Sequence, residues 1–142
     1  MISGLVISKV NGELSSADGL SKQHFPKLNI NFDSVEGEGK DLKIDYTFEA
    51  SYKDGDSESS KEIGKLTLSG YINIQDDESA IKEAISKWKE KHSLPVKMAE
   101  EVINGLNFRC SATGTLVAYS LGLIPPLVIS QTRIEEPKDE KQ

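Results

Sequence analysis

The chain has few of the side chains that build catalytic or metal centres. It carries one cysteine, Cys110, and two histidines, His24 and His92, among 142 residues. A single cysteine cannot form a disulfide within the chain, and no cysteine or histidine pair has the spacing of metal ligands. We expect both histidines to be exposed loop residues and Cys110 to be a small buried apolar side chain of a helix. The sequence therefore indicates a protein that is not an enzyme and holds no metal or cofactor.

Positive charge is also limited, because 17 lysines and arginines face 23 aspartates and glutamates and leave a formal net charge of −6. Nucleic-acid binding needs a basic patch for the phosphates. None is visible, so we expect no nucleic-acid partner. The chain also lacks a membrane span. The uncharged window Cys110–Thr132 has about the required length, but small polar residues and Pro125-Pro126 interrupt it. The first residues lack the basic and apolar regions of a secretory signal, which favours a cytoplasmic protein.

Alternation of apolar and polar residues predicts four strands in the first half of the chain. The clearest spans Leu42–Tyr52, and the others lie at Ile2–Val10, Leu28–Asp33 and Lys65–Ile74. One apolar and one polar face per strand is typical of an antiparallel sheet. A short turn at Glu36–Gly39 and a polar loop at Lys53–Glu62 then suggest a four-stranded meander.

In the second half of the chain, apolar residues recur at the spacing of α-helices. Asp76 or Asp77 can cap a helix whose apolar side chains recur at helical intervals. A second helix is expected from about Val96 to Leu121, with Pro95 suited to its first turn and Gly122 as its C-cap. Its length of roughly 40 Å would cross a whole domain of this size, so it either breaks near Gly114 or meets another subunit. Strands followed by helices predict the α+β class, with both helices on one face of the sheet. We expect one domain over residues 1–134 and a charged, disordered tail at 135–142.

No charge occurs between Arg109 and Arg133. So much uncharged surface has to be covered by a core, by a second subunit or by a client. After the double proline, residues Leu127–Ile129 either pack into the core or line a groove that accepts an extended apolar peptide.

Four antiparallel strands, a helix, a longer helix and a Gly-x-x-Pro-Pro-hydrophobic segment together resemble the SecB-like chaperones. The resemblance is carried by Leu42–Tyr52, Lys65–Ile74 and the ending Leu121–Ile134. It implies an ATP-independent holdase that binds unfolded or newly made polypeptides in hydrophobic grooves. It also implies a homo-oligomer, in which dimers pair into tetramers. The final residues show no ending suited to an export motor, so that partner is not carried over.

The candidate client-binding residues are apolar or aromatic side chains of the third and fourth strands and of the C-terminal segment: Phe48, Tyr52, Tyr71, Leu127 and Ile129. Two other functions stay open. A small-molecule-binding α+β domain would need a closed cavity with convergent polar groups. A non-catalytic oligomeric adaptor would use the long helix only as a dimer interface.

Overall fold

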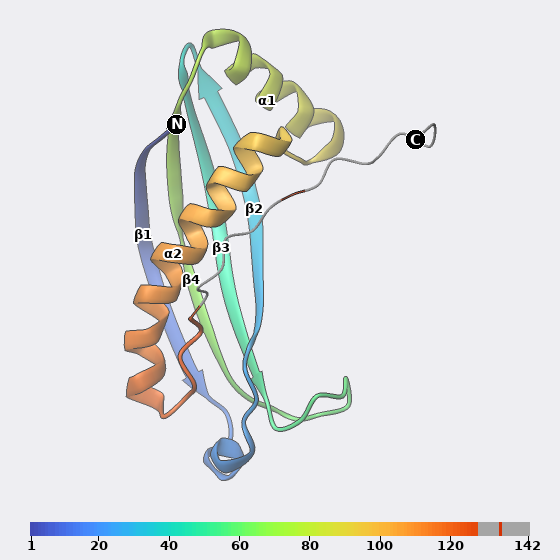
Figure 1. Cartoon of the computed structure of the whole chain (residues 1–142), viewed down its shortest axis with the longest axis vertical. Helices are drawn as coiled ribbons and strands as arrows, with labels where there is room; N and C mark the ends of the chain where they lie inside the picture. The colour runs from blue at the N-terminus through green and yellow to red at the C-terminus, as the bar shows by residue number, and fades with distance from the viewer. Residues whose placement is uncertain (128–133, 135–142) are drawn as a thin grey trace.

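The structure is a computed structural model, and it describes residues 1–127 and 134. One antiparallel sheet carries two helices on the same face (Figure 1), which confirms the predicted α+β class. The strands are β1 (Ile2–Leu14), β2 (Lys27–Glu38), β3 (Asp41–Lys53) and β4 (Glu62–Gln75), and the helices are α1 (Glu78–Lys91) and α2 (Val96–Leu121). A short 3-10 helix, Ala17–Lys22, lies between β1 and β2. The predicted tail at 135–142 lies outside the described residues.

The strand order is β1-β4-β3-β2, so the predicted meander is correct for β2, β3 and β4 and wrong for β1. The first strand pairs with β4 at the far side of the sheet. Its connector to β2 crosses the ends of the two central strands on the way. Ser15 N–H donates to Ile63 O at the start of β4, and His24 N–H donates to Lys53 O at the end of β3. The connector is thus long enough to carry the chain from one edge to the other.

The predicted turn at Glu36–Gly39 is shorter than expected. Glu36, Gly37 and Glu38 continue β2 and pair with β3, so only Gly39 and Lys40 make the turn. Gly39 has a φ of 62°, in the left-handed region that glycine adopts without strain. Gly37 had suggested a loop, but it lies under α1. A Cβ there would stand 2.8 Å from a Leu42 methyl carbon and 3.0 Å from one of Ile85.

α2 is one unbroken helix that lies diagonally across the sheet (Figure 1). It packs on β1 and β4, whereas α1 packs on β2 and β3. A break near Gly114, one of the two alternatives for the length of α2, does not occur. This glycine instead allows a close contact, since a Cβ there would be 2.9 Å from Pro126 Cγ. The core lies between the helices and the inward faces of the two central strands. Its largest fully buried side chains include Tyr46, Phe48, Tyr52, Leu66, Leu68, Ile72 and Leu106.

A register shift in β1 lies beside a glycine of β4. Gly70 pairs with both Tyr46 and Ile7, and the register of β1 shifts between Ile7 and Lys9. The buried Tyr46 hydroxyl donates to the carbonyl of Val6 at 2.9 Å. A Cβ on Gly70 would stand only 1.9 Å from that same oxygen. Gly70 therefore provides the space in which the β1 backbone comes close to the Tyr46 hydroxyl.

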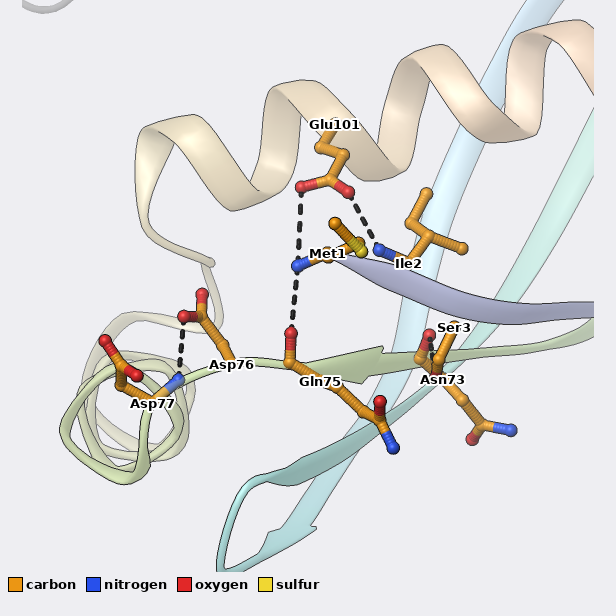
Figure 2. A network of polar contacts seen from close by, with 8 residues as sticks. All are labelled: Met1, Ile2, Ser3, Asn73, Gln75, Asp76, Asp77 and Glu101. Carbon is orange, nitrogen blue, oxygen red and sulfur yellow. Dashed lines mark hydrogen bonds and ion pairs between the residues drawn. The ribbon is translucent and has the colours of Figure 1, made fainter.

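The start of β1 is fastened to α2 by one carboxylate (Figure 2). Glu101 accepts a hydrogen bond from Ile2 N–H at 2.8 Å and lies 3.8 Å from the Met1 amino group. The amino group also donates to Gln75 O at 3.0 Å, and Gln75 N–H donates to Met1 O. Because β1 is an edge strand, Glu101 supplies an acceptor to a backbone donor that would otherwise need water.

Candidate functional site

The chain leaves α2 through a short stem, Gly122–Leu127. Gly122 is left-handed, with φ 74°, and Leu123 N–H donates back to Ala118 O at 2.9 Å. This is a regular helix ending in which a glycine reverses the chain and the last carbonyls find donors. Pro125 and Pro126 follow, and neither can donate a backbone hydrogen bond. Pro126 is buried, whereas Leu127 is 52% exposed.

Two side chains from distant segments hold the peptide groups of this stem. The Gln23 amide oxygen accepts from Ile124 N–H at 2.7 Å, and its nitrogen donates to Gly122 O at 3.0 Å and to Leu20 O at 3.1 Å. The Tyr52 hydroxyl donates to Ile124 O at 2.5 Å. Ile124 is therefore held at its N–H by the β1–β2 connector and at its C=O by β3. We call Gln23 and Tyr52 the stem clamp.

The structure separates the five candidate client-binding residues. Phe48 and Tyr52 are 0% exposed and belong to the core beneath the helices. Tyr71 is half-buried on the opposite face of the sheet, where the Lys43 ammonium lies 4.7 Å from its ring centre. Leu127 is exposed at the end of the stem, and Ile129 lies outside the described residues. Among the described candidates, then, only Leu127 offers a large apolar surface to solvent.

A row of exposed apolar side chains on α2 had not been singled out from the sequence. Phe108, Leu116 and Tyr119 are 78%, 71% and 73% exposed. With the exposed Ala112, they recur at helical spacing along the outer side of α2, and we call these four residues the α2 stripe. The spacing was readable in the sequence. A lack of charge alone does not reveal it, because the uncharged stretch covers both the buried and the exposed side of the helix.

A second set of partly exposed apolar side chains lies on β2. Leu28, Ile30 and Phe32 pack against the core but stay half-buried at this edge of the sheet. Their alternation with polar residues was predicted, and it places them on the side of the sheet that bears the helices. They are half-buried, whereas Leu127 and the α2 stripe are exposed, and all of them are among the apolar residues that the helix-bearing side leaves open to solvent.

Two hollows have mixed polar and apolar linings that include none of these residues. One of about 490 Å³ lies at the end of the sheet that holds the β2–β3 turn, and its lining includes Glu36, Asp41 and Asn73. The other, of about 230 Å³, lies beside His24 and the β3–β4 loop. Within residues 1–127 and 134, no cluster of histidine, cysteine or acidic side chains has the arrangement of a metal site.

The histidines and the cysteine lie where the sequence predicted. His24 is exposed and its Nδ1 lies 3.1 Å from an Asp56 carboxylate oxygen, while His92 is exposed at the end of α1. Cys110 is fully buried on the sheet side of α2. Burial raises the pKa of its thiol to about 11, although the neighbouring Tyr46 hydroxyl acts in the opposite direction. Such a thiol stays protonated and is a poor nucleophile.

No helix in the part of the chain that the structure describes is both long and apolar enough to cross a membrane.

Comparison with known proteins gives a fold and no family. No protein-family model and no curated protein sequence matches the chain. Among solved structures, it is similar to the Mycobacterium tuberculosis Rv1957 SecB-like chaperone in complex with a ChAD peptide from the Rv1956 HigA1 antitoxin. The TM-score is 0.65 at 8% sequence identity, over 95% of this chain and 92% of that one. The fold is therefore SecB-like.

Proposed function

We propose that this chain is an ATP-independent molecular chaperone, a holdase that binds unfolded or newly made polypeptides. The observation that carries the proposal is the exposure of large apolar side chains on the helix-bearing side of a SecB-like sheet. Unfolded chains expose apolar side chains that folded proteins bury, and transferring them onto an apolar surface is favourable by roughly 25 cal/mol per Å². The solved neighbour with the same fold is a chaperone with a peptide bound.

The proposal includes self-association through the α2 stripe into a dimer or tetramer. Copies with a net charge of −6 repel one another over most of their surface. The α2 stripe avoids this repulsion, because no acidic residue occurs from Val102 to Leu121, where Arg109 is the one charged side chain. Three exposed large side chains on one helix also need cover in water. A two-fold pairing would bring the same stripe from two copies together.

Client contact is proposed at the end of the stem and on the sheet. Leu127 and Ile129 bind apolar client side chains, with Phe48 and Tyr52 supporting this region from the core. Tyr71 adds a contact on the opposite face. Each contact is weak, and several copies in one oligomer raise the overall affinity for a long client. The mechanism needs no nucleotide, metal or cofactor. The proposal also treats residues 1–134 as one domain. It places the protein in the cytoplasm, where new chains emerge.

The test follows the aggregation of several chemically unfolded proteins by light scattering after dilution, without ATP, at equimolar subunits. We expect the wild-type protein to suppress aggregation and Leu127→Ala to suppress it less. Phe25→Ala is the matched control, because Phe25 is 57% exposed, close to the 52% of Leu127, but lies on the β1–β2 connector. No suppression with any client would refute the holdase. A dimer that suppresses nothing would instead support a non-catalytic adaptor.

A further inference from the structure

The stem of α2 combines a rigid backbone with an abrupt change in exposure. Ile124 is held through both its N–H and its C=O, and the next two residues are prolines whose φ is fixed near −65°. Pro126 then packs against Gly114, where a side chain would leave too little room. Over a single residue, the chain passes from buried Pro126 to Leu127, which is 52% exposed.

We propose that the stem clamp, Gln23 and Tyr52, is a positioning device that fixes the direction in which Leu127 meets the client. This inference rests on the proposed chaperone function. It adds two residues that do not themselves contact the client, and it gives a reason for a polar side chain in the β1–β2 connector. The same hydrogen bonds join three segments that are far apart in sequence: the connector, β3 and the stem.

The geometry shows why the positioning depends on these two side chains. Gln23 uses both amide hydrogens and the amide oxygen, so its orientation is fixed by Leu20, Gly122 and Ile124 together. Tyr52 is fully buried, so its hydroxyl cannot exchange the bond to Ile124 O for a bond to water. Losing either one frees one of the two peptide groups that flank Ile124, and the prolines beyond it then transmit the added motion to Leu127. A positioned side chain binds more tightly than a mobile one because less freedom is lost on binding.

The sequence offers a matched control within the same strand. Tyr46 is also a buried β3 tyrosine, 1% exposed, and its hydroxyl also donates to a backbone carbonyl, that of Val6. Tyr46→Phe and Tyr52→Phe each remove one comparable hydrogen bond and leave the ring in place. Both variants lose stability, but only Tyr52→Phe releases the stem. Gln23→Met removes the other half of the clamp with a side chain of similar length.

The first experiment measures binding of fluorescein-labelled, reduced and carboxymethylated α-lactalbumin, a permanently unfolded polypeptide, by anisotropy well below the unfolding temperature. We expect Leu127→Ala, Tyr52→Phe and Gln23→Met each to weaken binding by about three- to tenfold, and Tyr46→Phe to leave it unchanged. In the Leu127→Ala background, Tyr52→Phe should weaken binding by clearly less than in the wild-type background, because much of its effect passes through Leu127. An equal loss in both backgrounds, or no loss in either clamp variant, would overturn the proposal.

A second experiment needs no client and separates this inference from the chaperone function. A spin label is placed at Leu127→Cys in a Cys110→Ala background, and its mobility is read by electron paramagnetic resonance. We expect the label to be more mobile with Tyr52→Phe or Gln23→Met and unchanged with Tyr46→Phe. Unchanged mobility in both clamp variants would overturn the positioning role. If the wild-type protein fails to bind the unfolded probe while the label responds as expected, the chaperone proposal falls and the clamp stands as a structural device.

Discussion

Gly70 offers the sharpest test of the fold, because a single added carbon meets backbone atoms. In Gly70→Ala, the new Cβ would stand 1.9 Å from Val6 O, 2.9 Å from Val6 C and 3.0 Å from Ile7 Cα. Backbone atoms cannot rotate aside as a flexible side chain can. The part of β1 around Val6 and Ile7 must therefore move by about 1 Å to remove the overlap.

The magnitude has two sources. Forcing extra volume into a packed core costs about 1–3 kcal/mol. Moving Val6 also takes the acceptor away from the Tyr46 hydroxyl, and an unsatisfied buried donor costs about 1–3 kcal/mol more. We expect Gly70→Ala to lower the free energy of unfolding by about 2–6 kcal/mol. A domain of this size has a total stability of about 5–15 kcal/mol.

Urea unfolding followed by circular dichroism measures this loss as a lower midpoint at unchanged slope. Gly4→Ala is the matched control in β1. Its Cβ would meet nothing closer than the Asn73 side-chain nitrogen at 3.6 Å, an ordinary contact. The control should change stability by no more than about 0.5 kcal/mol. Equal losses in the two variants, or a loss below about 1 kcal/mol for Gly70→Ala, would refute the close approach of β1 to Gly70 and Tyr46.

Three further predictions concern the cysteine, the edge strand and the helix stripe. The native state keeps the Cys110 proton up to a pKa of about 11, whereas the unfolded chain releases it near 9. Because the native state then holds more protons, this contribution to stability is full below pH 9 and is lost as the pH rises to 11, and Cys110→Ala should show a shallower alkaline decline. An identical decline in both proteins would contradict the burial of the thiol. Glu101→Ala removes the acceptor of Ile2 N–H, so amide exchange at Ile2 should speed up at least about tenfold, with total stability lowered by less than about 1 kcal/mol. Leu68, in the central strand β4, should exchange as before, and equal acceleration at both sites would point to global unfolding instead. Phe108→Ser with Leu116→Ser should shift the mass measured by light scattering toward the monomer, whereas Phe25→Ser should not. An unchanged oligomer in the double variant would exclude the α2 stripe as its interface.

The features that the sequence predicted well are those set by neighbouring residues. The bounds of α2 followed from Pro95 before the first turn and Gly122 after the last, since both signals act within one helical turn. The inward row of β3 followed from its period of two, and the same alternation explains why Phe48 and Tyr52 are buried. The prediction that Phe48 and Tyr52 contact clients relied on their aromatic character rather than on this alternation, which places both side chains on the inward face.

The features that the sequence did not predict depend on distant partners. Nothing in Ile2–Leu14 says whether β2 or β4 is its neighbour, because either one can complete the ladder. Gly37 is typical of a turn, yet it lies in β2, where the absence of a side chain leaves room for Ile85 of α1. Gln23 stood in an aperiodic polar segment, where a hydrogen bond to Ile124 leaves no trace in composition or spacing.

The position of β1 has a consequence for folding during synthesis. The first strand made has no partner until the fourth is complete, because Ile2 pairs with Ile74 and Leu5 with Ile72. Contacts so far apart in sequence are slow to form. While the ribosome adds the intervening residues, the apolar side chains of β1 stay in water and are open to wrong partners. A protein that we propose protects unfinished chains therefore passes through an unprotected stage of its own during synthesis.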